Sequence, residues 1–224
     1  MIYLPVTLLL FLVLLLGLPF LWLGLAIDAV QVAAAKLGFS PNAALLLFLL
    51  VVAGSTVNIP LYERVSSVPV LWDTLELWGS RFFWGLPLRR IEQKTIVALN
   101  VGGGLIPTLL ALYQFTRVNP WGILAVMLVV TVVSYYSAQV VPGIGIQMNA
   151  LVAPLTAAMV ALLIAPAGAA PSMAFAGGVL GTLIGADLLH LPQIERMTPG
   201  VLSIGGAGVF DGIALCGLLA LLLT

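Results

Sequence analysis

The sequence contains very little charge. Only 7% of its 224 residues are Asp, Glu, Lys or Arg, whereas about a quarter are charged in soluble globular proteins. A soluble domain cannot cover its surface with so few charges, while a bilayer requires only that backbone polar groups are satisfied internally. The hydrophobic content of 62% and the mean hydropathy of +1.22 agree with this. The composition excludes a soluble domain and predicts a protein that crosses the membrane several times.

Metal-binding and redox residues are equally scarce. Cys216 is the one cysteine and His190 the one histidine, so the chain has no disulfide framework and cannot assemble a zinc site by itself. We therefore expect no metal and no cofactor. A formal net charge of zero gives no reason to expect nucleic acid as a partner, and leaves the lipid bilayer as the main one.

Long apolar stretches are abundant. About twenty apolar residues cross the hydrocarbon core as a helix, and the sequence offers seven such stretches: residues 3–27, 41–59, 95–115, 121–138, 149–166, 171–189 and 199–223. They predict an all-α fold, a polytopic transmembrane helix bundle of about seven spans in a single domain, 1–224. Glycine and proline are expected to break or kink some spans. Residues 140–154 either cross the membrane or form a re-entrant segment.

Most of the charge lies in one loop, at about residues 61–94. It contains five bases together with tryptophans and phenylalanines, which predicts an amphipathic element at the membrane interface. With seven spans, this loop shares a side with the amino terminus and Arg196, and Lys36 and Arg117 lie opposite. The excess of bases then predicts a cytoplasmic amino terminus.

Two aspartates lie within the apolar spans. Asp187 and Asp211 are 24 positions apart in the last two predicted spans. Ionisation in hydrocarbon costs several kcal/mol, so such acids normally face a bundle interior or a wet cavity. The two carboxylates meet at one depth only if the segment SIGGAG is unwound and the last helix begins near Val209. Asp211 would then lie in its first turn, where the helix dipole favours negative charge.

Other residues are expected to support this pair. His190 is three positions after Asp187, so on a helix it faces the same way and can hydrogen-bond the acid. Residues 177, 181 and 185 form a stripe of glycines for helix packing. Amides recur next to glycine or proline at span ends, as in segments that line a cavity. The supporting residues predicted are His190, Gly185, Gly206, Gly208, Gly212, Asn58, Asn100, Gln147 and Asn149.

Five segments carry a family resemblance: GSTVNIPL, NVGGGLIP, VPGIGI, GTLIGADLLHL and SIGGAGVFDGI. In these the chain resembles a prokaryotic family of membrane proteins, the domain of unknown function 1614, over nearly its whole length from about Pro41. The resemblance implies a prokaryotic cytoplasmic membrane and no particular activity.

A second, partial similarity is to intramembrane aspartyl proteases of the presenilin and prepilin-peptidase type. These use one aspartate on each of two helices, one of them in a Gly-x-Gly-Asp motif. Asp187 follows Gly185-Ala186 and lacks one glycine of the motif, while Asp211 follows Gly206-Ala207-Gly208 with two extra residues between.

Three functions follow from these features. The first is an intramembrane aspartyl protease-like hydrolase that uses Asp187 and Asp211 as catalytic residues on a transmembrane peptide. The second is a transporter of a small solute or ion, with Asp211 in a broken-helix site near the midplane; a homo-oligomer would compensate for the small size of the chain. The third is a membrane scaffold whose polar residues only hold helices together.

Overall fold

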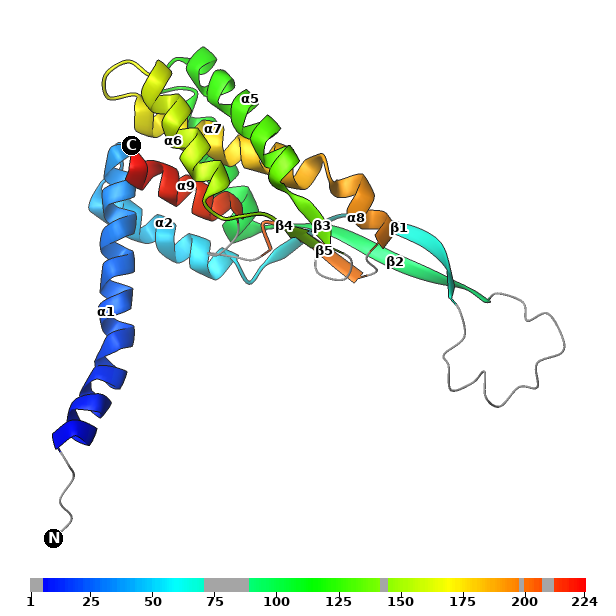
Figure 1. The fold of residues 1–224 in the computed structure, drawn as a ribbon, viewed down its shortest axis with the longest axis horizontal. Coiled ribbons are helices and arrows are strands. Elements are labelled where there is room, and N and C mark those ends of the chain that lie inside the picture. Colours follow the sequence, from blue (N-terminus) through cyan, green and yellow to red (C-terminus); the bar gives the residue numbers. More distant parts are fainter. Residues whose placement is uncertain (1–5, 71–88, 142–144, 198–199, 207–211) are drawn as a thin grey trace, which may run out of the picture.

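The structure is a computed structural model that describes residues 6–70, 89–141, 145–197, 200–206 and 212–224. Helices dominate it, and a long two-stranded hairpin projects from the helical body (Figure 1). Three helical stretches are long and apolar enough to cross a membrane: Leu10–Lys36, Pro120–Ser137 and Ala170–Ile194. Pro41–Gly54, Val101–Gln114 and Val152–Ile164 are apolar but shorter. The length and composition of the helices therefore fit a membrane protein.

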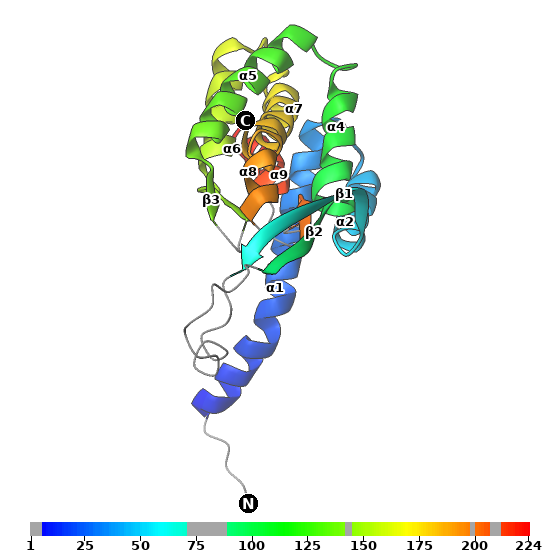
Figure 2. The same cartoon turned by 90° about the vertical axis from the view of Figure 1, so that its right-hand side faces the viewer.

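The amino-terminal helix α1, Val6–Lys36, projects away from the rest of the molecule over most of its length (Figures 1 and 2). Its side chains are exposed from Leu10 to Leu25, and burial begins only near Ala33. Helix α2, Pro41–Gly54, returns beside its carboxyl-terminal end. Ser40 caps α2 by accepting a hydrogen bond from the Ala43 backbone at 3.3 Å, and proline occupies the first turn, as helix amino termini favour.

Helix α7, Ala170–Thr182, forms the centre of the helical body, and every residue from Ser172 to Thr182 is buried. It is surrounded by four helices: α4 (Ile106–Gln114), α5 (Pro120–Ser137), α6 (Val152–Ile164) and α9 (Gly212–Leu223). The predicted glycine stripe forms the contact with α5. A Cβ added to Gly177 would lie 2.6 Å from Cβ of Val126, and one added to Gly181 would lie 2.7 Å from Cβ of Val130. The packing role predicted for these glycines is confirmed.

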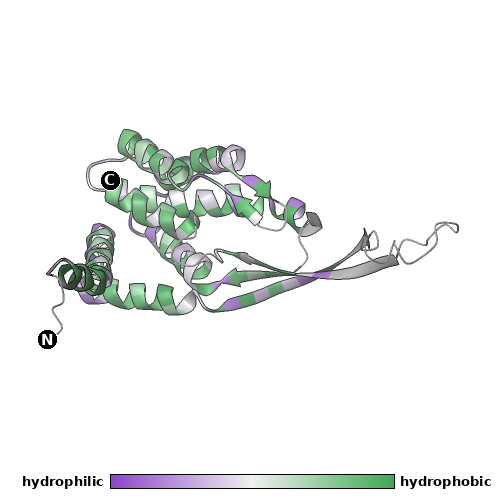
Figure 3. Cartoon of the chain, turned by 60° about the horizontal axis from the view of Figure 1, so that its bottom comes forward, coloured by the Kyte–Doolittle hydropathy of each residue, from purple (hydrophilic) through white to green (hydrophobic). Residues whose placement is uncertain are grey.

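A three-stranded sheet in the order β1-β2-β5 adjoins the helices. Strands β1, Asn58–Val70, and β2, Arg89–Asn100, pair antiparallel, with Asn58 opposite Asn100. Strand β5, Gly200–Ile204, pairs with β2 in parallel. The prediction of an all-α fold is therefore confirmed only in part: helices predominate, but the predicted interfacial loop at 61–94 is in part a β-hairpin. Polar residues mark the hairpin, whereas the helices are predominantly apolar (Figure 3).

The strands also shorten three of the predicted spans. The span at 41–59 ends as a helix at Gly54, and the span at 95–115 begins as the end of β2 and continues through the π-helical turn η1, Val101–Leu105. The span at 199–223 is divided between β5 and α9, and a turn at Gly205 and Gly206 follows β5. The predicted helix start near Val209 lies outside the described residues. Strands β3, Gln139–Val141, and β4, Gly145–Gln147, form a short hairpin in the region for which a re-entrant segment was considered.

Candidate functional site

Asp187 lies in a second π-helical turn, η2, Leu183–Leu188, which continues α7 towards the short helix α8, Leu191–Met197. A π-helical turn widens the helix by one residue, and such turns are frequent at functional sites. Gly185 allows η2 to approach α5, because a Cβ on this residue would lie only 2.3 Å from the carbonyl oxygen of Thr131. The close approach of Gly185 to α5 holds η2 in place. Asp187, which is half-buried, belongs to this turn.

A cavity of about 290 Å³ adjoins Asp187. Its other walls come from β4, α8 and β5, and they include Ser203 and the predicted supporting residue Gly206. An aspartate, a serine and a strand thus line one space. An acid beside a cavity is the arrangement expected for proton transfer or ligand binding, and it differs from a carboxylate enclosed among packed helices.

Ser203 connects this cavity to the predicted amides. Its hydroxyl donates a hydrogen bond to Oδ1 of Asn58 at 2.5 Å. Ser203 is paired with Ala98 in the sheet, and Ala98 lies two positions before Asn100 on β2. Alternate residues of a strand share a face, so Ser203, Asn58 and Asn100 lie on the same face of the sheet.

Asn100 is the centre of the amide cluster and is fully buried. Its Nδ2 donates to Oδ1 of Asn58 at 3.0 Å and to the carbonyl oxygen of Ser55 at 2.8 Å. Its Oδ1 accepts from the Gly103 backbone at 2.9 Å and so caps η1. One side chain therefore joins the end of α2, the base of the hairpin and the first turn of η1.

Glycines bring η1 against the end of β5. Gly205 has φ +71°, and a Cβ on it would lie 2.5 Å from the backbone nitrogen of Gly104. A Cβ on Gly102 would lie 2.1 Å from the carbonyl oxygen of Val51 in α2. At NVGGG the backbone of η1 therefore lies very close to the backbones of α2 and of the segment that follows β5. This close packing accounts for the glycines without a ligand.

His190 follows η2 and is buried. Its Nδ1 lies 3.1 Å from the carbonyl oxygen of Gly185 and 3.0 Å from that of Ala186. Carbonyls only accept, so Nδ1 is the protonated nitrogen. The ring also stacks on Tyr135 of α5, with centroids 4.8 Å apart and planes inclined by 30°. These contacts anchor His190 to the turn that presents Asp187.

The other predicted residues have different outcomes. Gln147 and Asn149 are exposed, and Asn149 accepts a hydrogen bond from the Leu151 backbone at 3.0 Å at the start of α6, away from the amide cluster. Gly212 is the first residue of α9. Asp211 and Gly208 lie outside the described residues, so the predicted Asp187–Asp211 pair stays a prediction.

Sequence reasoning missed Ser203, which lies in both the cavity and the amide cluster. It is a single hydroxyl in the segment VLSIGG, and no spacing rule distinguishes it from a helix-packing serine. Its position beside Asn58 follows from the pairing of β5 with β2. Among the described residues, no group of three or more His, Cys, Asp or Glu side chains is placed to hold a metal ion.

The segments that build this site, GSTVN, NVGGG, GADLLH and SIGG, all lie within residues 52–223. These residues match the model of a family described as "Protein of unknown function (DUF1614)". The chain belongs to the DUF1614 family. The match begins near the end of α2, so α1 and most of α2 precede the DUF1614 region. No curated protein and no solved structure matches the chain.

Proposed function

We propose that this DUF1614 protein is an intramembrane aspartyl hydrolase that cleaves a peptide bond with Asp187 and Asp211. The supporting observation is the cavity of about 290 Å³, which Asp187 lines together with β5. In the sequence, Asp211 follows the end of β5 by seven positions and directly precedes α9. A short connection from the cavity wall to the second acid is consistent with a site that contains both carboxylates.

The proposed chemistry is that of a proton-sharing pair. Two neighbouring carboxylates cannot both ionise cheaply, so one is protonated. The ionised carboxylate takes a proton from water as the water oxygen bonds to the carbonyl carbon of the substrate, and the protonated carboxyl donates to the carbonyl oxygen. Collapse of the adduct breaks the carbon–nitrogen bond, and the amine leaves with the proton that the first carboxylate had taken. The products are a carboxylic acid and an amine.

Strand β5 gives the site a means of holding an extended peptide. In the described sheet, β5 is an edge strand that pairs with β2 alone. Its residues from Val201 to Ile204 line the cavity. A peptide that adds to a strand edge is held by main-chain hydrogen bonds, independently of most of its sequence. A transmembrane substrate that unwinds next to β5 would present its backbone to Asp187.

The proposal includes an orientation in a prokaryotic cytoplasmic membrane with a cytoplasmic amino terminus. Lys36 at the end of α1 donates from Nζ to the carbonyl oxygen of Leu221 in α9 at 2.8 Å. Gly38 contacts the guanidinium of Arg117, which follows α4. The carboxyl-terminal ends of α1, α4 and α9 therefore lie together, which supports the alternation of spans inferred from the charge distribution.

The deciding experiment is cleavage in liposomes. The probe is a fluorescence-quenched peptide with one apolar span of about twenty residues interrupted by Gly-Gly. We expect wild-type protein to cleave it, and Asp187→Asn and Asp211→Asn each to abolish cleavage while the elution volume and the melting temperature stay unchanged. Asp28→Asn is the matched control, because Asp28 is an exposed acid on α1. Normal cleavage by either active-site variant would reject the proposal.

Transport is the second candidate, and the same cavity favours it, because a carboxylate beside a polar wall also binds a cation or proton. Solute uptake that depends on a proton or sodium gradient, is lost in Asp187→Asn and occurs without peptide cleavage would replace the hydrolase proposal. A scaffold role fits less well, since a scaffold has no need of a cavity beside its acid.

A further inference from the structure

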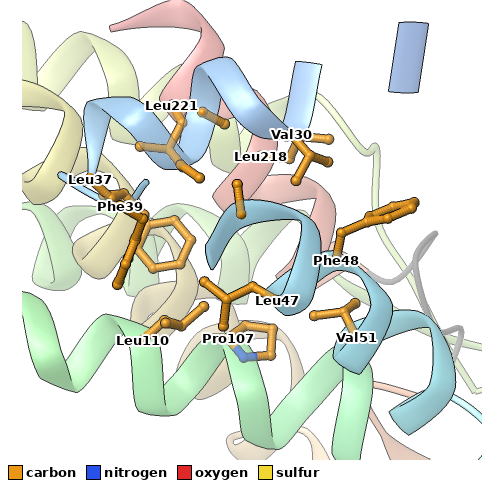
Figure 4. Close-up of a pocket in the computed structure, with 14 residues that line it drawn as sticks. Val30, Leu37, Phe39, Leu47, Phe48, Val51, Pro107, Leu110, Leu218 and Leu221 are labelled. Atoms are coloured by element: carbon orange, nitrogen blue, oxygen red, sulfur yellow. The ribbon is translucent and has the colours of Figure 1, made fainter. Parts of the chain in front are cut away.

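An apolar groove lies between the amino-terminal helices and the DUF1614 region (Figure 4). Its volume is about 140 Å³, and residues of α1, α2, α4, α7 and α9 line it. Leu37 and Phe39 form one end, and Leu47, Leu110 and Leu221 surround the interior (Figure 4). Every lining residue is apolar. The groove therefore suits a hydrocarbon ligand and not a polar solute.

Two cations lie at the end of the groove formed by Leu37 and Phe39. Lys36 is exposed, and its Nζ contacts the carbonyl oxygen of Leu221, a groove residue. Arg117 is exposed, packs against Gly38 and donates to the hydroxyl of Tyr113 at 3.4 Å. Tyr113 in turn contacts the ring of Phe39, with centroids 5.9 Å apart.

Neither cation has an acidic partner in the described parts of the chain. The hydrogen bonds of Lys36 and Arg117 go to neutral oxygens. A positive charge beside a neutral oxygen retains its attraction for an anion, and a basic pocket between membrane helices is the arrangement that binds a lipid head group. The two bases thus add a preference for negative charge to the end of an apolar groove.

We propose that the groove binds one acyl chain of an anionic phospholipid, with Lys36 and Arg117 contacting its phosphate group. The apolar interior of the groove and the two cations at its end match the order of acyl chain and phosphate in a phospholipid. An apolar cavity of roughly 150 Å³ holds benzene, so the groove accepts a segment of the chain. The remainder would lie along the exposed face of α1. The lipid would join α1 and α2 to the DUF1614 region.

Native mass spectrometry of the full chain in neutral detergent tests this assignment. The probes are dioleoyl phosphatidylglycerol and dioleoyl phosphatidylcholine, which share acyl chains and differ in net charge. We expect the anionic lipid to bind more tightly. Each surface base contributes about a fivefold preference, so Arg117→Gln should weaken phosphatidylglycerol binding about fivefold, and the double variant with Lys36→Gln roughly 25-fold. Lys94→Gln is the matched control, because Lys94 is an exposed base on β2.

A second variant tests the groove itself. Ala34 lines it and is 8% exposed, so Ala34→Leu fills the space without changing any charge. We expect this variant to lose binding of both lipids while its melting temperature in detergent stays within a few degrees of wild type. Arg117→Gln provides the result if Ala34→Leu does not fold, because it alters only an exposed side chain.

Three results would overturn the assignment. The first is equal affinity of the wild type for the two lipids, and the second is unchanged phosphatidylglycerol binding in Arg117→Gln. The third is a dimer that Ala34→Leu dissociates and that excludes lipid, which would identify a second copy of the chain as the occupant. Loss of lipid binding leaves the cleavage assay unaffected as a test of the Asp187 site, because the two proposals concern different cavities.

Discussion

Nδ2 of Asn100 donates to Oδ1 of Asn58 at 3.0 Å, although the two residues are 42 positions apart in the chain. They are directly opposed at the base of the β1–β2 hairpin, next to the π-helical turn η1. The same Oδ1 accepts from Ser203. Oδ1 of Asn58 thus joins β1, β2 and β5, and of these strands β5 lines the Asp187 cavity. The amides therefore support the cavity through β5 and do not line it.

We expect Asn100→Ala to be strongly destabilising. The change removes the bonds to Asn58 and Ser55 and leaves the Gly103 backbone without its acceptor in a buried place. Buried groups that lose their partners cost about 1–3 kcal/mol each, so we predict a loss of about 3 kcal/mol in the free energy of unfolding, measured in detergent.

Asn149→Ala is the control for this prediction. Asn149 is exposed, and its Oδ1 accepts a single hydrogen bond from the Leu151 backbone at 3.0 Å, just before α6. Its loss should cost about 1 kcal/mol or less. Equal destabilisation by the two variants would show that the cluster around Asn100 contributes no more than a single exposed hydrogen bond.

Local patterns predicted the helix packing, whereas the long-range pairing was not predictable. Spacing by four residues placed the glycines at 177, 181 and 185 on one helix face, and the structure confirms that contact. The hairpin was interpreted as an interfacial loop, because its aromatics and bases have the composition of a membrane boundary. Strand pairing depends on partners far away in the sequence, and the partner of Ala98 is Ser203, 105 positions later.

Asp187 shows the same difference between what local sequence predicts and what long-range packing determines. A carboxylate in an apolar segment was enough to single out Asp187, because charge in hydrocarbon requires a reason. The π-helical turn that presents Asp187 was not predicted, and it lies where Gly185 approaches the Thr131 carbonyl of another helix, a contact that the local sequence does not specify. His190 was predicted to hydrogen-bond Asp187, and that contact stays a prediction; Nδ1 of His190 donates to the carbonyl oxygens of Gly185 and Ala186.

Gly185→Ala should separate η2 from α5. The added methyl group would lie 2.3 Å from the carbonyl oxygen of Thr131, which is backbone and cannot turn aside. Overpacking of this kind costs about 1–3 kcal/mol, and it would displace Asp187. We predict a lower melting temperature and reduced peptide cleavage. Gly24→Ala on α1, where nothing lies within 4 Å, should be neutral or slightly stabilising; a similar loss in both variants would contradict the packing argument.

Gly205→Ala should cost more than Gly168→Ala. Both glycines have positive φ, +71° and +79°, so alanine strains the backbone at either position. Only at Gly205 does the new Cβ also meet backbone, the nitrogen of Gly104 at 2.5 Å. We expect about 1 kcal/mol of destabilisation at Gly168 and at least twice that at Gly205, by chemical denaturation in detergent. Equal destabilisation by the two variants would mean that β5 and η1 can move apart to accommodate the methyl group at little energetic cost.

The proposed orientation predicts which residues are reached from outside the cell. Thr116 is exposed next to Arg117, and Glu63 is exposed on β1. In a Cys216→Ala background, we expect Thr116→Cys to react with a membrane-impermeant maleimide in intact cells, and Glu63→Cys to react only after permeabilisation. Cys216 itself is fully buried, so wild-type protein should stay unlabelled until it is denatured. Labelling of Glu63→Cys in intact cells, with Thr116→Cys protected, would reverse the orientation and place the Asp187 cavity nearer the outer side of the membrane.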